Sequence, residues 1–414
     1  MDPLAEWTDI PHACEPETQP TLRHRVPDAR IIGVDIARCL ALVGMIAVHL
    51  LSDTAPNGAM SLPFILAAGK SAALFALLAG VGLAFSTGRT QRPRGRRWVG
   101  AVAGVTVRAV LIAAVGLALG SIIPPDKAEI ILVSYAAMFL FAVFFLRLPP
   151  GVLVALAGIV ALGGPVLSHV LRTELPTDTV PNPSFPMLLA SPSGTVREVL
   201  LTGAFPALVW FAYVLAGMAV GRLVLSRRRT AIGLTTVGAL LAVAANGAAW
   251  FLMDRMGGRE ALAAAAHPIM ERGDYADLLV WGASGTLPTN SPWWLAVLAP
   301  HTSTPVDIVF TLGIALAVLG LSLTLGLVTR GSLRPLARFG SMPLSVYVLH
   351  LLLLVAPFLP ETNSGVIEFA IHIALLGGFA LLWRHFFRRG PLEQVLWWAA
   401  RGVSRPISGQ RIRP

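Results

Sequence analysis

The feature that most constrains this chain is a series of apolar stretches, each nearly as long as a membrane is thick. About 20 apolar residues suffice for a helix to cross the hydrocarbon layer of a bilayer. Hydrophobic residues make up 55% of the 414 residues and charged residues 13%, whereas a soluble domain carries about 25% charged residues. The sequence therefore predicts an all-α, polytopic integral membrane protein with about ten transmembrane helices. These helices are expected at residues 30–51, 70–88, 98–123, 130–146, 152–170, 203–225, 230–253, 306–328, 342–359 and 366–383.

The arginines indicate how the helices are oriented. They cluster after the second, sixth, eighth and tenth stretches, which for ten helices lie on the same side as both termini. Positive residues are enriched in cytoplasmic loops, so both termini are predicted to be cytoplasmic. The polar segments 172–202 and 254–305 then face the outside. The same rule explains the net charge of +10. Nucleic acid is not an expected partner, because no basic face interleaved with aromatic residues lies outside the helices.

Three parts are expected along the chain. Residues 1–29 are polar and contain prolines, which predicts a disordered cytoplasmic arm. Residues 30–390 are expected to form one transmembrane domain, and residues 391–414 an amphipathic tail at the membrane surface. The two cysteines, Cys14 and Cys39, do not have the spacing of metal ligands. No metal is therefore expected.

His49, near the outer end of the first helix, is the leading catalytic candidate. Ionisable residues inside a membrane span are costly and by default suggest a function. Ser52 and Asp53 follow at once, and Lys70 begins the second helix. A neutral histidine can take a proton near pH 7, and the Lys70 cation can stabilise a developing oxyanion. A buried histidine that is simply bonded to a neighbouring helix is the alternative that the sequence leaves open.

Three further histidines lie in or next to the later helices. His301 precedes the eighth helix in the motif PHTSTP, whose serine, threonines and second proline are explained as a helix N-terminus. A helix cap does not explain the histidine, so His301 is the second catalytic candidate, expected to line an outer cavity. His350, midway along the ninth helix, is left unassigned. Glu368 and His372 share a face of the tenth helix and are interpreted as a pair that satisfies itself.

Arginines on the inner side are candidates for binding an anionic ligand. Most loop arginines need no ligand, because the orientation rule and anionic lipids explain them. Arg108 is the exception, since it lies within an apolar stretch where a charge needs a partner. Asp35 and Arg38 are three residues apart on one helix, which favours a structural ion pair. The residues predicted to bind this anionic ligand are Arg30, Arg38, Arg97, Arg108 and Arg338.

Four stretches of the chain point to one family. They are GVDIARCLALVGMIAVHLL, AALFALLAGVGLAFSTG, PHTSTP and GSMPLSVYVLH. Together they resemble bacterial relatives of the heparan-α-glucosaminide N-acetyltransferase family, which are polytopic transmembrane acyltransferases. The resemblance covers the first two helices well, the eighth to tenth fairly, and the middle only in hydropathy. It implies that acetyl-CoA is used from the cytoplasmic side and that the acyl group reaches an acceptor on the far side.

The expected active site differs from the pattern of that family. The family has an asparagine near the outer end of the first helix and a histidine in the following loop, and these two form its active site. Here His49 stands at the asparagine-like position, and residues 52–69 contain no histidine. The resemblance therefore leaves two interpretations. Either His49 is itself the catalytic histidine, or the site has been altered.

The leading hypothesis is a multi-pass acyltransferase of the plasma membrane. It would move an acyl group, acetyl in the simplest case, from cytoplasmic acyl-CoA to an extracytoplasmic cell-envelope glycan or glycolipid. Its expected partners are acyl-CoA, that acceptor and membrane lipids. A proton-coupled transporter or a lipid or glycolipid exporter is the alternative, although the repeated span pattern of many transporters is not found. A non-catalytic membrane scaffold is the third hypothesis. The acceptor, the acyl chain length and the oligomeric state, including a homo-oligomer, remain open.

Overall fold

The computed structural model describes residues 30–89, 92–175, 182–283, 286–329, 332–357 and 363–409. Ile31–Pro414 form one compact unit, separate from Met1–Arg30. The arm expected to be disordered, residues 1–29, lies outside the described residues. All regular elements in the described part are helices, and the backbone pairing between Thr54 and Met60 is an isolated bridge. The prediction of an all-α protein is confirmed.

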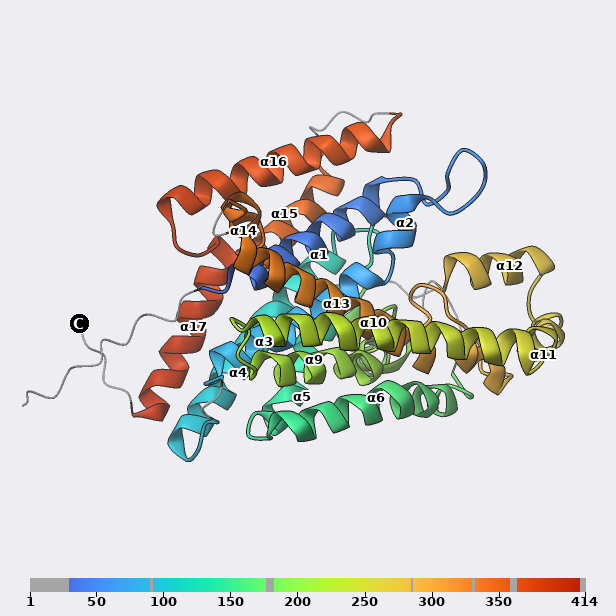
Figure 1. The fold of residues 1–414 in the computed structure, drawn as a ribbon, viewed down its shortest axis with the longest axis horizontal. Helices are drawn as coiled ribbons and strands as arrows, with labels where there is room; N and C mark the ends of the chain where they lie inside the picture. The colour runs from blue at the N-terminus through green and yellow to red at the C-terminus, as the bar shows by residue number, and fades with distance from the viewer. Residues whose placement is uncertain are drawn as a thin grey trace, which may run out of the picture. The chain divides into compact units, whose positions relative to one another are not determined.

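The helices follow one another along the chain with short connections, and most are labelled in Figure 1. The elements are α1 (Ile32–Leu50), α2 (Leu62–Ala67), α3 (Lys70–Ser86), α4 (Arg96–Gly120), α5 (Leu132–Ala142), η1 (Val143–Phe145), α6 (Pro150–Leu171), α7 (Phe185–Ala190), α8 (Pro192–Arg197), η2 (Glu198–Thr202), α9 (Ala207–Gly221), α10 (Arg228–Trp250), η3 (Phe251–Arg255), α11 (Gly258–Ala266), α12 (Arg272–Trp281), η4 (Pro292–Ala296), α13 (Pro305–Val328), α14 (Arg334–Phe339), α15 (Pro343–Leu354), α16 (Gly365–Phe386) and α17 (Pro391–Ser408).

Seven helices in the described part are long and apolar enough to cross a membrane. They comprise α2 with α3 as one span, together with α1, α4, α6, α10 with η3, α13 and α16. The other three expected spans coincide with the shorter helices α5, α9 and α15. The segment Pro192–Thr202 and α9 form an eighth candidate that is bent by 56°. The protein is therefore a multi-helix membrane protein, and the count of ten spans stays a prediction.

The ends of the long helices gather in two groups, as alternating crossings require. At the end expected to be cytoplasmic, Gly221 at the end of α9 contacts Ala84 near the end of α3. At the opposite end, the start of α16 at Gly365 contacts Leu50, where α1 finishes. Helices α3 and α9 thus run parallel to each other, whereas α1 and α16 run in opposite directions. The placement of both termini in the cytoplasm is not decided by these contacts and stays a prediction.

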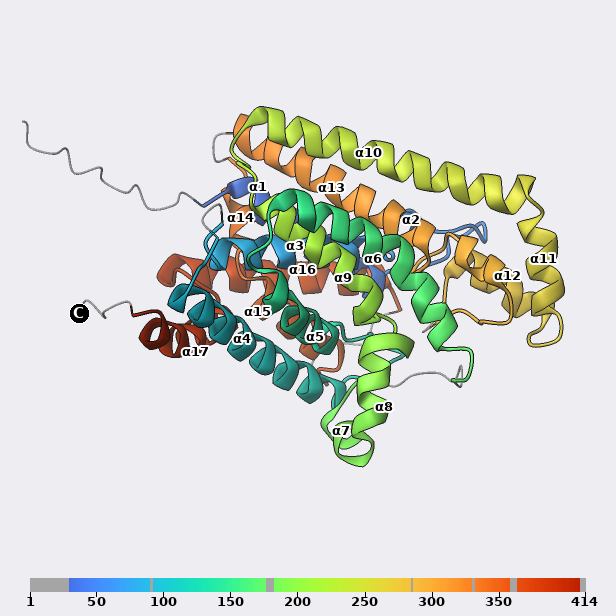
Figure 2. The ribbon, with the colours of Figure 1, turned by 90° about the horizontal axis from the view of Figure 1, so that it is seen from below.

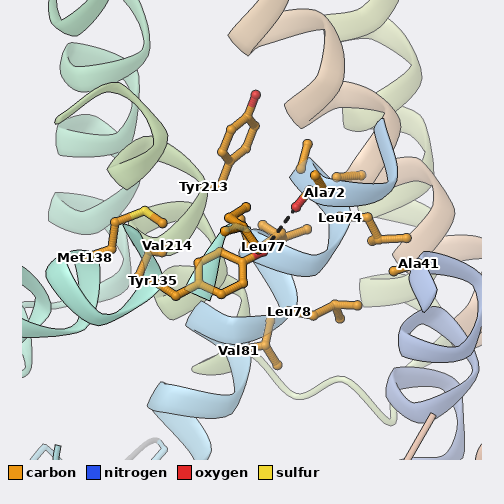
Figure 3. Close-up of a cluster of buried hydrophobic side chains, with 14 of the residues drawn as sticks. Ala41, Ala72, Leu74, Leu77, Leu78, Val81, Tyr135, Met138, Tyr213 and Val214 are labelled. Carbon is orange, nitrogen blue, oxygen red and sulfur yellow. Dashed lines mark hydrogen bonds between the residues drawn. The ribbon is translucent and has the colours of Figure 1, made fainter. Parts of the chain in front are cut away.

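Helix α3 lies at the centre of the hydrophobic core. Figure 3 shows leucine and valine side chains of α3 between side chains of α1, α5 and α9. Tyr135 from α5 donates a hydrogen bond of 3.4 Å to the carbonyl oxygen of Ala72. Its hydroxyl group is thereby satisfied inside an apolar environment, where an unpaired donor is costly. The central position of α3 fixes Lys70, its first residue, at the end of the bundle that is expected to face outward.

Glycines let two pairs of helices approach closely. A Cβ atom on Gly217 of α9 would overlap the carbonyl oxygen of Leu77 in α3, and one on Gly80 of α3 would overlap that of Val214. Small residues allow such close contact between membrane helices. Helices α10 and α13 lie alongside each other over much of their length (Figure 2), with Gly238 against Gly313 at one contact.

The C-terminal helix α17 packs against α4. Ser404 and Ala400 of α17 contact Gly104. The carboxylate of Glu393 accepts hydrogen bonds from the main-chain N–H of Leu344 and from the hydroxyl of Ser345, at the N-terminus of α15. A carboxylate at that position also interacts favourably with the helix dipole. The tail is thus a helix joined to the bundle, and its location at the membrane surface stays a prediction.

We expect Gly217→Ala to destabilise the protein. The added methyl group would meet the main chain of α3 rather than a side chain that can move away. Overpacking of this kind costs about 1–3 kcal/mol. Thermal unfolding of the purified protein in detergent measures the loss.

Gly158→Ala in α6 is the matched control for this variant. No heavy atom lies within 4 Å of the Cβ position at Gly158. Alanine is a better helix former than glycine by about 1 kcal/mol, so this variant should unfold at the parent's temperature or above it. Equal stability of the two variants would contradict the close α3–α9 contact.

Candidate functional site

Three histidines from three helices meet at one point of the bundle, and two of their rings are stacked. His49 lies in α1, His350 in α15 and His372 in α16. His49 Nδ1 and His350 Nε2 are 3.0 Å apart, and the two rings are parallel within 6° with their centroids 5.2 Å apart. The His372 ring meets the His350 ring at 75°, with 5.3 Å between centroids. The outer end of α1 is therefore linked to the two helices near the end of the chain.

His372 makes a hydrogen bond to the main chain, whereas one nitrogen of His350 and one of His372 have no described partner. His372 Nδ1 lies 2.9 Å from the carbonyl oxygen of Glu368, one turn earlier in α16. The expected contact between Glu368 and His372 is thus made to the main-chain carbonyl group, and it leaves the other ring nitrogen of His372 without a partner among the described residues. His350 Nδ1 and His372 Nε2 are buried and have no hydrogen-bond partner in the described part of the protein. Unpaired buried groups are costly, so these two atoms require an explanation.

His301 is held in an unusual main-chain conformation. It has φ +59° and Ser303 has φ +52°, a left-handed conformation that non-glycine residues rarely adopt. Such residues cost on the order of 1–3 kcal/mol each and cluster at functional sites. The expected helix cap is confirmed, because Thr304 Oγ1 accepts from the N–H of Asp307, and Asp307 Oδ2 accepts from the N–H of Ser303.

Contacts with α9 and α3 fix this loop in place. Trp210 on α9 donates a hydrogen bond of 3.0 Å from its Nε1 to the hydroxyl of Ser303. Gly69, at the N-terminus of α3, has φ +68° and lies against Pro300 and the main chain of His301. The loop therefore brings His301 to the outer end of α3, where Lys70 follows Gly69.

The structure brings the three predicted catalytic residues, His49, His301 and Lys70, into electrostatic contact. His301 interacts with both His49 and Lys70, and Lys70 interacts with Asp307. Burial lowers the pKa of His301, Glu129 raises it and Lys70 lowers it further. His301 Nδ1 is buried and has no hydrogen-bond partner in the described ranges. The cluster contains a proton acceptor and a cation, and the catalytic roles of its members stay predictions.

The five predicted donor-binding arginines do not form one cluster. Arg38 Nη1 pairs with Asp35 Oδ1 at 3.1 Å, as expected for a structural ion pair. Arg97 and Arg338 are exposed, on α4 and α14. Arg30 belongs to the separate unit Met1–Arg30, so it has no assigned position beside the other four.

Arg108 lies beside arginines that sequence analysis did not select. It interacts electrostatically with Arg389, just before α17. The guanidinium groups of Arg389 and Arg401 lie over the Trp397 ring, 3.9 and 4.2 Å from its centroid. These contacts hold two arginines near the α4–α17 contact. Cation–π contacts of this kind stabilise a guanidinium group.

Two further features bear on the site. A small pocket lies beyond the 302–304 loop, lined among others by His169, Arg172 and Trp294 but not by the histidine stack. Across the described residues, no group of three or more His, Cys, Asp or Glu side chains is arranged to hold a metal ion. The expectation that the protein has no metal stays a prediction.

Sequence analysis missed His350 and the part played by His372. The signal that could have identified them is their expected depth in the membrane. His350 is four residues before the end of α15, and His372 is seven residues after the start of α16. At 1.5 Å per residue these positions lie within about 10 Å of the same outer end, where His49 also lies. Depth can be read from the sequence, whereas the lateral contact between the three helices cannot.

Comparison with protein families identifies the relationship of the chain. The family model described as heparan-alpha-glucosaminide N-acetyltransferase, catalytic, matches residues 30–252, which is more than half of the chain. The chain belongs to this family. A comparison with curated proteins gives no match. The predicted resemblance is confirmed.

Membership of the N-acetyltransferase family identifies the class of reaction. The protein is a membrane acetyltransferase-type enzyme, and enzymes of this family use acetyl-CoA as donor. The match includes the middle of the chain, where sequence analysis found only similar hydropathy, and ends before α11. His49, Lys70 and Arg108 lie inside the matched segment. His301, His350 and His372 lie outside it, and their place in the site rests on the structure.

The lowered pKa of His301 predicts how its replacement changes the pH dependence of stability. An unfolded histidine titrates near pH 6.5, and folding opposes protonation of this ring. Its contribution to stability is therefore complete above about pH 6.5 and is lost as the pH falls through the lower folded pKa. When the pH is lowered from 7.5 to 5.5, we expect the unfolding temperature of His301→Gln to fall less than that of the parent.

Exposed His267 provides the control for this comparison. His267→Gln should keep the parent's pH dependence when thermal unfolding is measured in the same detergent. An identical slope for His301→Gln and the parent would show that His301 is freely protonated in the folded protein.

Proposed function

We propose that this protein transfers the acetyl group of cytoplasmic acetyl-CoA to an acceptor on the outer side of the plasma membrane. The acceptor is an amine or hydroxyl group of a cell-envelope glycan or glycolipid. Membership of the N-acetyltransferase family supports the reaction class. The histidine cluster at the end of the bundle expected to face outward supports the location of the chemistry. The single observation that carries the proposal is the contact of His49 with a second histidine inside an acetyltransferase fold.

In this proposal His49 is the general base. Its Nδ1 is engaged by His350, so Nε2 is the nitrogen that faces an acceptor. As the acceptor amine or hydroxyl attacks the thioester carbonyl, its proton passes to His49 Nε2. The new N–C or O–C bond forms, the C–S bond breaks, and the coenzyme A thiolate leaves and takes up a proton. A positioned general base typically contributes about 10²–10⁴-fold to the rate.

Lys70 and His301 are proposed to act on the same acceptor complex. The Lys70 ammonium group interacts electrostatically with both His301 and Asp307. A preorganised cation stabilises the oxyanion of a tetrahedral intermediate. His301 is proposed to orient the acceptor, because strained main-chain conformations such as its own are common at residues that hold a ligand.

The donor is proposed to bind through its phosphate groups at the inner side. Arg108 is close to Arg389, and Arg401 shares the Trp397 ring with Arg389. Guanidinium groups bind phosphate through paired hydrogen bonds. Arg30, Arg38, Arg97 and Arg338 remain proposed donor-binding residues, although the ion pair with Asp35 engages Arg38. Family membership favours acyl transfer over the transporter, exporter and scaffold alternatives.

We expect His49→Ala to lower acetyl transfer by about 10²-fold or more, while coenzyme A binding stays close to that of the parent. The phosphates of the donor are proposed to lie at the opposite end of the bundle, so loss of the His49 ring should not reach them. The measurement is transfer from radiolabelled acetyl-CoA to envelope glycans by purified protein in detergent, with coenzyme A binding followed by thermal shift.

Two variants make this test specific. His267→Ala removes an exposed histidine away from the cluster and should keep full activity. His49→Asn introduces the residue type that the family resemblance suggests, and substantial activity in this variant would show that His49 orients the acceptor while His301 is the base. Normal activity of His49→Ala would contradict the proposed site.

A further inference from the structure

The histidine stack ends at a group that can only accept a hydrogen bond. His372 Nδ1 lies 2.9 Å from the main-chain carbonyl oxygen of Glu368. A carbonyl oxygen has no hydrogen to donate, so His372 Nδ1 must carry a proton in this bond. A neutral imidazole has one protonated nitrogen and one acceptor nitrogen. In the neutral ring, His372 Nε2 is therefore an acceptor.

The ring that contacts His372 carries the other unsatisfied nitrogen. His350 Nδ1 and His372 Nε2 are both buried without a hydrogen-bond partner in the described structure, and their rings are in contact. The side chains of His350 and His372 are 1% and 4% exposed, so bulk water does not satisfy them. A hydrogen bond between these two atoms would pair both, and because His372 Nε2 can only accept, His350 Nδ1 would be its donor.

The same reasoning continues to His49. With its proton on Nδ1, neutral His350 has an acceptor at Nε2. His49 Nδ1, 3.0 Å away, then donates to His350 Nε2, and neutral His49 has an unprotonated Nε2. The carbonyl group of Glu368 thus determines the tautomer of a ring two histidines away. Neutral rings are the relevant state, since imidazolium rings in direct contact would repel one another.

We propose that His350 and His372 are positioning residues that hold His49 in the tautomer whose Nε2 can accept a proton. This inference rests on the proposed role of His49 as base, and it adds the two residues that prepare the base. A histidine that acts as a base is commonly oriented by another residue that fixes its tautomer. Here the orienting groups are two neutral histidines and a main-chain carbonyl.

The proposed chain orients His49 without conducting protons away from it. When the acceptor gives its proton to His49 Nε2, the ring becomes an imidazolium whose Nδ1–H already donates to His350. No other proton needs to move. The far end of the chain is a carbonyl oxygen, which takes up no proton near neutral pH, so the proton leaves from His49 Nε2 itself.

The tautomers can be measured directly. Nitrogen NMR of the full-length protein labelled with ¹⁵N-histidine, recorded at pH 8 in lipid, distinguishes protonated from unprotonated ring nitrogens. We expect Nδ1–H with unprotonated Nε2 at His49, His350 and His372, with signals assigned by single substitutions. His372→Phe should release His49 into a mixture of tautomers. An Nε2–H tautomer at His49 in the parent would overturn the proposal.

A pair of isosteric amides tests the catalytic consequence. The side-chain amide of glutamine reaches the position of histidine Nε2, and that of asparagine reaches only the position of Nδ1. His350→Gln should therefore still accept from His49 Nδ1–H and keep kcat within about 10-fold, whereas His350→Asn should lose on the order of 10²-fold, the lower value for a general base. KM should change little in both. Equal kcat for the two variants would contradict the positioning role.

The two measurements separate this inference from the proposed function. The NMR result does not depend on any acceptor, so predicted tautomers in a protein that fails to transfer acetyl groups would retain the histidine chain and reject the function. Transfer that requires His49, in a parent protein whose His49 carries its proton on Nε2, would retain the function and reject the chain.

Discussion

Polar side chains inside a membrane must find their partners within the protein, because the bilayer offers none. This constraint explains the site. His49, His350 and His372 lie far apart in the sequence, and each would be an isolated polar group in an apolar helix. In the bundle they contact one another, and the last one is bonded to a carbonyl group in its own helix. The close glycine contacts of α3 with α9 hold Lys70 and the His301 loop at the same end.

The sequence predicted the helices well, because hydrophobic stretches and arginine clusters are local signals. The expected spans at 30–51, 98–123 and 306–328 correspond to α1, α4 and α13. The PHTSTP motif correctly predicted a helix cap at Thr304. The stretch expected at 342–359 gave only the 12 residues of α15, which begins at Pro343 as expected but ends at Leu354.

The sequence could not predict which helices are neighbours. Hydropathy gives the depth of a residue but not the rotation of its helix, so His350 stayed unassigned and its bond to His49 was not foreseen. The arginines show the same limit. Arg108 was selected because it lies in an apolar stretch, but Arg389, with which it interacts, was counted only among the loop arginines after the tenth stretch. Arg38, by contrast, was correctly paired with Asp35, because three residues along one helix is a local distance.

Transfer across a membrane tests the central claim most directly. Purified protein would be reconstituted in vesicles with acetyl-CoA sealed inside and glucosamine, a soluble amino sugar, outside. If the donor binds at one end of the bundle and the histidine cluster acts at the other, acetylated sugar accumulates outside in vesicles with the parent protein and not with His49→Ala. Product that forms only when donor and acceptor share one side of the membrane would contradict this account.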